Sequence, residues 1–475
     1  MAVGDSNLFF NRDTKVYAVQ ATGTSTFNVW EIPVLNGYSF SQATNSSQIT
    51  LNEMSDATGR SRRGQRSFND SLAPAEWSID TYARPTLATV VRAPEELLWT
   101  SMFAETNYIP AAGLAAGLPF GTGAVLASGV VTLTFTSAAP AGGTYFKVGD
   151  TITATGVTYT GNTAGIAAGA ATNVVVTATT NTSVSFVAPA GTTAVTATAG
   201  KVNSTTFATT ATELDFLSTS SNKTKLGTFD LYFVLGANKA ISDGATNGVF
   251  TASDATTIYR IGNACVNEAT VNFEIDGIST ISWSGMGRTV TELASVDFSA
   301  AGYTLITNGV TSTSNMIRNR LTALSAVGVT PNAKTYSVTL TGGSITISNN
   351  MSFLTPETIG VVNQPLEHVT GTRSVSGSFT CYLDEATNGS IDLYQDLLSA
   401  TTTVTNKFDL EFYVGGKGAT AGYPASPGIM FEMGQCHLEI PTINIDDVIG
   451  FEVNFTALPT TISNTDELSR IRYVA

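Results

Sequence analysis

The sequence predicts a mainly β protein in which one β domain occurs twice and a third β module interrupts the first copy. Three observations lead to this expectation: strand-like segments that recur in the same order, a central stretch of short alternating strands, and few charged residues. The repeat determines the architecture of the chain. Charged residues make up 13% of the chain, against the ~25% usual in soluble domains. Thr, Ser, Ala and Gly replace them, and such a surface suits broad contacts with other protein.

The clearest repeat consists of two pairs of segments. The first pair is FDLYFVLG at 229–236 and FDLEFYVG at 408–415, an offset of 179 residues (408 − 229). The second pair is TVNFEIDGISTISWSG at 270–285 and TINIDDVIGFEVNFTA at 442–457, an offset of 172 (442 − 270). All four segments read as strands and keep the same order. A tandem duplication with few catalytic residue types indicates assembly rather than catalysis.

The segments before these strands correspond as well. A hairpin pattern with a turn signal at Asn36–Gly37 opens the first copy, and one with a glycine pair at Gly342–Gly343 opens the second. The matching stretches are TKVYAV (14–19) with RLTALSAV (320–327), FNVWEIPVLNGYSFSQ (27–42) with TYSVTLTGGSITISNN (335–350), and AEWSIDTYARP (75–85) with VSGSFTCYLDE (375–385). In the last of these pairs Tyr82 falls opposite Tyr382.

Each copy then contains one short helix. The first is PEELLWTSMFA at 94–104, where Pro94 at the first helical position and the acidic first turn are start signals. The second is IDLYQDLLSA at 391–400, with Ser390 as the expected N-cap. Their apolar residues, including Trp99, are suited to cover the open face of a sheet, which is ordinary core packing.

Residues 118–210 interrupt the first copy. They contain only three charged residues, Lys147, Asp150 and Lys201. The strings VVTLTFTS, DTITATGVTY, NVVVTAT and SVSFVAP read as short strands, and their regular recurrence favours an inserted immunoglobulin-like β-sandwich over a disordered low-complexity loop.

The predicted division of the chain has three parts. Residues 1–117 with 211–299 form the first domain, 118–210 the insert, and 300–475 the second domain. The formal net charge of −14 disfavours binding of nucleic-acid phosphates. It is explained either by solubility or by a surface that repels DNA and lets it slide.

Cysteine usage and the termini limit the remaining possibilities. The three cysteines, Cys265, Cys381 and Cys436, are too few and odd in number for a disulfide framework. We expect buried small hydrophobic residues, with a bridge between Cys265 and Cys436 as the alternative. The N-terminal MAVGDSNLFF lacks the features of a signal peptide, and no run of about 18 apolar residues is present. We therefore expect synthesis in a cytoplasm and no membrane segment.

Residues suited to catalysis or metal binding are scarce. The two histidines, His368 and His437, lie in unrelated contexts, and WSGMG at 283–287 lacks the spacing of a nucleophile elbow. No HExxH and no phosphate-binding P-loop motif occur. The pair Asp446–Asp447 reads as a solvated turn rather than a metal site. We expect no enzyme activity, no cofactor and no metal.

One basic cluster stands out in this acidic chain. The segment SDATGRSRRGQRSFNDSL contains Arg60, Arg62, Arg63 and Arg66. One interpretation is an exposed flexible loop with solvated charges. The other is an arm that reaches an acidic neighbour, namely a second copy of the chain, because arginine is suited to carboxylate contacts.

Three stretches carry a family resemblance: RRGQRSFNDSLAPAEWSIDTYARP (62–85), LTGGSITISNNMSFLTPE (340–357) and PTINIDDVIGFEVNFTALP (441–459). They resemble tail tube proteins of bacteriophages with long non-contractile tails, the kind whose tube rings are trimers. The resemblance covers the first 105 residues and about 225–475, but not the insert. It implies two fused tail tube domains, each a β-sandwich with a flanking helix. Three chains would then form a pseudo-hexameric ring whose inner strands close into one β-barrel.

The resemblance also implies a function and partners. Rings would stack into a hollow tube, since a repeated contact that does not close gives a filament. Viral DNA would pass through the lumen without specific binding, and the arginine loop would reach the adjacent ring. The other partners would be a tape measure protein inside the lumen, the tail-tip or distal tail proteins and a tail terminator. The chain would assemble in the cytoplasm of a host bacterium and end in the virion.

Two other classes of function remain open from the sequence. One is an exported bacterial surface-layer or adhesin-type β protein, whose Thr/Ala/Gly-rich modules would resemble the insert. The absence of a recognisable signal peptide disfavours it. The other is a tail-associated glycan hydrolase, which would need a pair of acid and base carboxylates that the sequence does not reveal.

Overall fold

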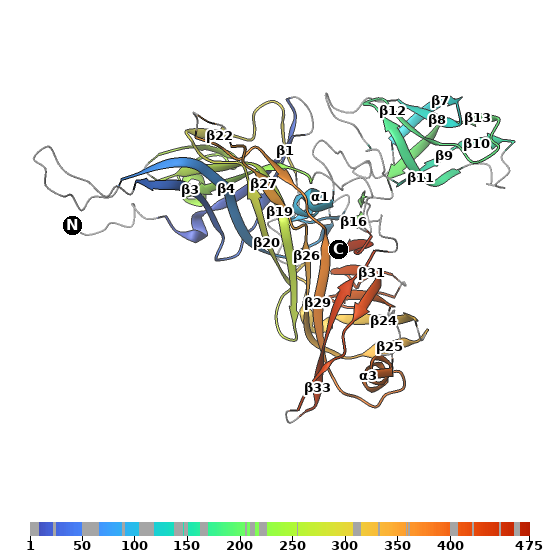
Figure 1. Ribbon diagram of the computed structural model, residues 1–475. Helices are drawn as coiled ribbons and strands as arrows, with labels where there is room; N and C mark the ends of the chain where they lie inside the picture. Colours follow the sequence, from blue (N-terminus) through green and yellow to red (C-terminus); the bar gives the residue numbers. More distant parts are fainter. Residues whose placement is uncertain are drawn as a thin grey trace, which may run out of the picture.

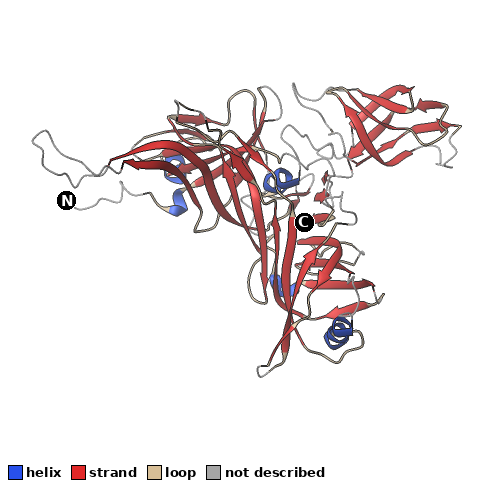
Figure 2. Cartoon of the chain, viewed as in Figure 1, coloured by secondary structure: helices blue, strands red, loops and turns tan. Residues whose placement is uncertain are grey.

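The computed structural model confirms a mainly β chain (Figures 1 and 2). It describes residues 9–21, 25–49, 66–87, 91–103, 118–136, 146, 151–161, 170–204, 207–209, 214–217, 226–253, 255–306, 315–330, 333–357, 359, 362–399, 407–419, 422–445, 448–459 and 466–475. Two long sheet regions cross near the centre of the molecule, and a smaller β module stands beside them (Figure 1).

One run of eight strands extends through both copies of the repeat. In spatial order the strands are β3 (Ser39–Ile49), β4 (Arg66–Tyr82), β20 (Thr280–Gly287), β19 (Thr257–Glu274), β26 (Leu340–Ser348), β29 (Ser374–Tyr382), β33 (Gly450–Ala457) and β32 (Thr442–Asn444). The first four come from the first copy and the last four from the second. All neighbours in this run are antiparallel.

The remaining strands of the two copies share one arrangement of three strands. In the first copy they are β1 (Lys15–Ala21), β2 (Phe27–Ile32), β17 (Phe229–Leu235), β21 (Val290–Leu293) and β23 (Tyr303–Leu305). In the second copy they are β24 (Ala323–Thr330), β25 (Thr335–Val338), β30 (Lys407–Val414), β31 (Gly428–Leu438) and β34 (Arg470–Val474). β1 lies between β2 and β17 as β24 lies between β25 and β30. β17 and β30, the two FDL strands, hence occupy equivalent positions.

Short strands complete the sheets. β16 (Leu214–Leu217) pairs with β15 (Phe207–Thr209) and with β34 of the second copy. Outside the insert, the described part of the chain also contains three two-stranded sheets: β5 (Thr86–Leu87) with β6 (Val91–Arg92), β18 (Val249–Thr251) with β22 (Ser295–Asp297), and β27 (Ser352–Leu354) with β28 (Glu367–Val369).

The strand registers refine the alignment of the two copies. Tyr82 pairs with Thr280, and its counterpart Tyr382 pairs with Gly450. Thr280 therefore corresponds to Gly450, an offset of 170 (450 − 280), whereas the preceding strand keeps the offset of 172. The turn between these strands is thus two residues longer in the first copy. An alignment of the two copies without a gap therefore pairs the residues after the turn two positions out of register.

The predicted helices are present, with one correction. They are α1 (Glu96–Phe103) and α3 (Ser390–Ser399). Ser390 was expected to cap α3 from outside, but it is the first helical residue. Its hydroxyl donates to the carbonyl oxygen of Tyr382 and accepts from the amide of Asp384. Because the preceding strand offers these partners, the side chain joins strand to helix.

Within the described residues, three further short helical segments were not predicted. They are the six-residue α2 (Ala237–Ser242) and the single 3₁₀ turns η2 (Asn11–Asp13) and η4 (Asn319–Leu321). Segments of one or two turns contain too few residues for a helical periodicity to stand out from the sequence.

The insert is a β module, as expected, but its sheet closes on itself. Its strands are β7 (Leu118–Ala127), β8 (Val130–Phe135), β9 (Thr151–Thr155), β10 (Val157–Thr160), β11 (Ala170–Thr179), β12 (Ser183–Val187), β13 (Ala194–Ala197) and β14 (Gly200–Ser204). Six of them form a closed barrel in the order β11, β12, β8, β7, β14, β9, while β10 pairs with β13. Its core is separate and includes Leu133, Ile152, Val184 and Phe186.

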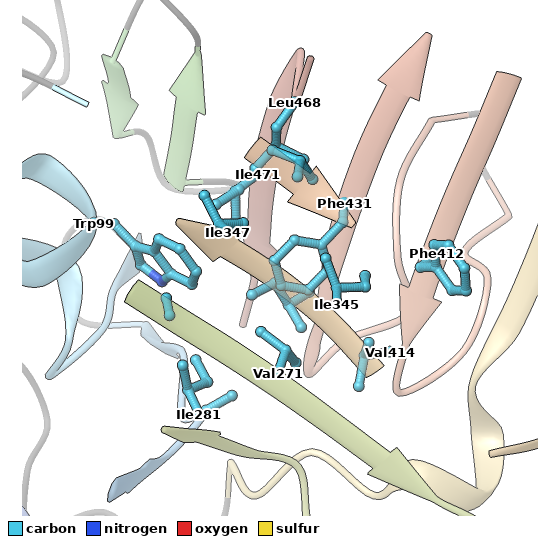
Figure 3. Close-up of a cluster of buried hydrophobic side chains, with 14 of the residues drawn as sticks. Trp99, Val271, Ile281, Ile345, Ile347, Phe412, Val414, Phe431, Leu468 and Ile471 are labelled. Atoms are coloured by element: carbon cyan, nitrogen blue, oxygen red, sulfur yellow. The ribbon is translucent and has the colours of Figure 1, made fainter. Parts of the chain in front are cut away.

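One hydrophobic core spans both copies of the repeat (Figure 3). Trp99 of α1 belongs to this core, with its ring centroid 4.6 Å from that of Trp283 in the first copy and 6.2 Å from that of Phe431 in the second. The Trp99 indole Nε1 donates to the hydroxyl of Tyr473 at 2.6 Å. The first helix therefore fastens the two copies to each other.

Candidate functional site: a polar sheet face with two unpaired edges

The eight-stranded run has one buried and one polar face. Because side chains alternate along a strand, each second residue faces the core. β20 shows the pattern clearly, with buried Ile281 and Trp283 between partly exposed Thr280, Ser282 and Ser284. The core-facing residues of the neighbouring strands include Ile79, Val271, Ile345, Phe379 and Val453.

The polar face consists mainly of serine, threonine and asparagine. One row across six strands reads Asp80, Ser282, Thr270, Thr346, Ser376 and Thr456. Hydroxyls on this face bond across the strands, at 3.1 Å between Thr270 and Thr346 and at 2.8 Å between Ser39 and Ser78. Such cross-strand pairs contribute about 0.2–1 kcal/mol each.

The charges on this face are all negative within the described part of the chain. The carboxylates are Glu76, Asp80, Glu268, Glu274 and Glu452, and no lysine or arginine among the described side chains occupies a position on this face. A broad polar surface with only carboxylates repels phosphate groups rather than binding them.

Several cations of the chain lie elsewhere, in ion pairs. Lys15 contacts Glu31 and Lys334 contacts Asp396, each at 2.8 Å. Arg260 lies on β19, but in the half that pairs with β17 and β21, and it faces Asp230. Segregation of the cations leaves the polar face acidic.

The outermost strands of the run, β3 and β32, have unpaired edges. β3 is hydrogen bonded to β4, β32 is bonded to β33, and the described residues provide neither with a second neighbour. Unpaired edges are ready to pair with another chain. The run therefore combines an acidic polar face with two edges that can extend it.

The strand seam inside the chain shows what such an extension looks like. The edge of the first copy, β19, pairs with the edge of the second, β26, from Glu268 opposite Ser348 to Glu274 opposite Gly342. This seam is long and antiparallel, and it keeps the polar face continuous across the two copies.

The basic cluster falls largely outside the described residues. This applies to Arg60, Arg62 and Arg63. Arg66 is the first residue of β4, and its backbone lies opposite Ile49. The structure does not describe its side chain. The contact role of the cluster therefore stays a prediction. Asp446 and Asp447 also lie outside the described residues.

The two histidines lie in separate surroundings, one buried and one exposed. His368 is buried, and its Nε2 accepts a hydrogen bond from the backbone amide of Leu226. The distance between its Nδ1 and the Sγ of Cys265 is 3.2 Å. Burial raises the pKa of the Cys265 thiol, so the sulfur is a structural partner rather than a nucleophile. His437 is exposed on β31. The contact between His368 and Cys265 joins the β27–β28 hairpin to β19.

The three cysteines lie buried on strands of the two copies. Cys265, Cys381 and Cys436 are buried and free, so the alternative of a bridge between the copies is wrong. The part of the chain that the structure describes contains no group of three His, Cys, Asp or Glu residues able to hold a metal ion. No helix in that part is long and apolar enough to cross a membrane.

The acidic face was not identified from the sequence, although a signal exists. Ser and Thr occur at every second position in TISWSG and SVSGSFT, which the structure places on β20 and β29. The alternation shows that one face is polar. It does not show that the two copies share one sheet, which depends on the β19–β26 seam.

The chain is similar to known proteins over most of its length. Residues 227–457 match the family model described as phage tail tube protein. The chain is also similar to the tail tube protein pb6 of Escherichia phage T5, with 27% identity over 463 residues, which cover 96% of this chain and 74% of that protein. The family match begins at β17 and ends at β33, so it includes the internal seam. The family match and this similarity together support a phage tail tube protein with a structural role in the tail.

Proposed function

We propose that three copies of the chain join edge to edge into a ring, and that rings stack into a hollow tube through which viral DNA leaves the virion. The β19–β26 seam carries this proposal, because it already joins two repeats in the way that neighbouring chains would join. Repetition of the same contact by β32 of one chain and β3 of the next closes the sheet into a barrel and removes both free edges.

The internal seam predicts the register between chains. Val271 pairs with Ile345 in the seam. Val271 corresponds to Ile443 by the offset of 172. Ile345 corresponds to Phe40, since Ile345 lies opposite Gly377 and Phe40 lies opposite Trp77, at equivalent positions of β29 and β4. Ile443 of one chain would therefore lie opposite Phe40 of the next.

The acidic face would line the lumen. The buried face is occupied by the core, so only the polar face is free to surround a channel. Carboxylates such as Glu268 and Glu452 would repel DNA phosphates and let the duplex slide. We propose neither a catalytic role nor a cofactor.

Further assignments rest on the resemblance. The tube would belong to a long non-contractile tail, assemble in the cytoplasm of the host bacterium, and meet a tape measure protein, tail-tip or distal tail proteins and a terminator. The arginine segment at the end of the β3–β4 hairpin would contact the adjacent ring, and the barrel at 118–204 would lie outside as a decoration. Residues 1–117 with 211–299 and residues 300–475 would act as two tube domains. An exported surface protein is not favoured.

Negative-stain electron microscopy of the purified protein, with its mass in solution, tests the proposal. Hollow tubes, or rings with the mass of three chains, are expected. Monomers at high concentration that stay monomeric after the tail-tip complex is added would overturn it.

A further inference from the structure

The internal seam has a second contact beside the strand pairing. The turn after β19 reaches the segment that precedes β24, where the amide of Ser279 donates to the carbonyl of Ile317 at 3.0 Å. The amide of Asn319 donates to the carbonyl of Gly277 at 3.2 Å. These bonds flank an antiparallel bridge between Ile278 and Arg318. The first copy of the repeat thus holds the entry segment of the second.

The entry segment of the first copy has the same local structure. Both segments contain a 3₁₀ turn with nearly the same sequence, Asn-Arg-Asp at 11–13 and Asn-Arg-Leu at 319–321. Phe9 and Ile317, which precede these turns at equivalent positions, both lie against a glycine in the left-handed region. The glycines are the equivalent Gly236 (φ 78°) and Gly415 (φ 94°).

The turn that corresponds to 275–279 is also present in the second copy. Ser279 accepts at its carbonyl from the amide of Ala83, and Ile449 accepts from the amide of Leu383. Since residues 83 and 383 are equivalent, Ile449 corresponds to Ser279 and Val448 to Ile278.

Exposure distinguishes the engaged contact from its free counterparts. Ile317 and Ser279 are both 0% exposed, whereas Phe9 is 45% and Ile449 is 42% exposed. Val448 is 59% exposed, against 37% for its engaged counterpart Ile278, and Ile445 on the same turn is 79% exposed. The turn of the second copy therefore presents three uncovered aliphatic side chains, Ile445, Val448 and Ile449, which we name the apolar turn.

We propose that the apolar turn of one chain binds the entry segment Phe9–Asn11 of the next chain, with Val448 opposite Phe10. The occupant is a second copy of this chain, since the same pair of elements already meets once inside the chain. Within one chain the two cannot meet, because β33, which follows the apolar turn, extends to the bottom of the molecule, whereas the start of the described chain, in dark blue, lies in its upper left part (Figure 1). The inference rests on the proposed ring and adds a second contact to it.

An engineered disulfide tests the contact. In the internal bridge the hydrogen bonds flank the pair Ile278–Arg318, which makes it a non-hydrogen-bonded pair with a Cα–Cα distance of about 4.5 Å. That distance lies within the range of about 4.4–6.8 Å between the Cα atoms of two disulfide-bonded cysteines. The double variant Phe10→Cys/Val448→Cys should therefore form covalent dimers and trimers under oxidation once rings have formed. The native cysteines are buried and free and provide no background.

Two controls make the outcome decisive. Ile278→Cys/Arg318→Cys should form the internal disulfide already in the monomer, and Phe10→Cys alone should give no trimers. If rings assemble and the internal pair oxidises while the Phe10/Val448 pair does not, the contact is wrong and the ring proposal stands. If the wild-type chain forms no rings or tubes with the tail-tip complex present, the ring proposal itself fails.

A matched pair of charge substitutions gives an independent measurement. Ile449→Asp should raise the protein concentration needed for assembly by ~10-fold or more, because its counterpart Ser279 is 0% exposed in the internal contact and a carboxylate would be buried there. Val187→Asp, at a position 60% exposed on the inserted barrel, should leave that concentration unchanged. Equal assembly of both variants would overturn the inference.

Discussion

At the scale of single residues, a buried carboxyl group makes the stability of this chain depend on pH. Glu95 is fully buried, and its Oε1 accepts from the hydroxyl of Tyr473 at 2.9 Å. Burial raises the pKa of Glu95 from 4.5 to about 7, while the hydrogen bond from Tyr473 and the nearby charge of Arg84 act in the opposite direction. Between pH 4.5 and about 7, Glu95 of the folded chain therefore holds a proton that the unfolded chain releases.

The sign of this effect gives a prediction. Since the folded state has the higher pKa, its contribution to stability is complete below pH 4.5 and is lost as the pH rises through about 7. The free energy of unfolding of the unassembled chain should fall across that window by at most ~1.4 kcal/mol per pH unit from this group. Urea unfolding followed by tryptophan fluorescence at several pH values measures the slope.

Glu95→Gln is the variant that isolates the group, because the amide keeps an acceptor for Tyr473. Its slope should be smaller than that of the wild type. Asp409, whose pKa burial raises to about 6, acts in the same direction, so Asp409→Asn serves as a comparison and some slope should remain. An unchanged slope in Glu95→Gln would assign the pH dependence to other groups.

At the scale of elements, helix α1 carries the coupling between the two copies. Trp99 contacts Trp283 from one copy and Phe431 from the other, and it is 0% exposed. Trp99→Ala should lower the free energy of unfolding by about 3–5 kcal/mol, since it leaves a cavity in the shared core. Leu398→Ala on α3, at a position 42% exposed, should change it by less than about 0.5 kcal/mol. Denaturant unfolding of both variants checks this, and similar small losses would contradict the central role of α1.

The β3–β4 hairpin is the element to which the basic cluster belongs. Arg62→Glu/Arg63→Glu should leave folding and ring formation intact and impair the stacking of rings, if the segment reaches an acidic site on the adjacent ring. The measurement is the length distribution of tubes in electron micrographs. Tubes of normal length from the double variant would refute the contact.

The repeated strands and the two longer helices could be predicted from the sequence, whereas the pairing of strands from distant segments could not. The FDL strands, the helices near 94–104 and 391–400 and the β character of the insert follow from periodicity and local signals. The closure of the insert into a barrel and the β19–β26 seam depend on hydrogen bonds between distant segments. Ser390 shows the same limit on a smaller scale, since its hydroxyl prefers strand partners that no local pattern reveals.

At the scale of the whole molecule, the acidic face is continuous because the two copies share one sheet. Its carboxylates come from β4, β19 and β33, which are far apart in sequence. Net charge alone therefore predicts an acidic protein, whereas only the seam places the charges on one surface. The same seam leaves β3 and β32 as free edges, so the charge pattern and the assembly edges have a common origin.

Reversal of charge on this face tests its role in the tube. Glu268→Lys/Glu452→Lys should still form tubes, because both side chains project from the polar face and do not enter the core. The tubes should now retain short duplex DNA at 50 mM salt and release it at 200 mM, since each phosphate contact adds to the salt dependence of binding. Co-sedimentation of labelled DNA with the tubes measures retention.

The control changes the net charge equally at other sites. Asp243→Lys/Glu385→Lys alters two exposed carboxylates outside the eight-stranded run. If the face lines the lumen, the control tubes should release DNA at both salt concentrations as wild-type tubes do, because DNA inside the channel cannot reach those side chains. Equal retention by both variants would mean that DNA binds the outer surface, and the carboxylates of the eight-stranded run would then not be the lining of the channel.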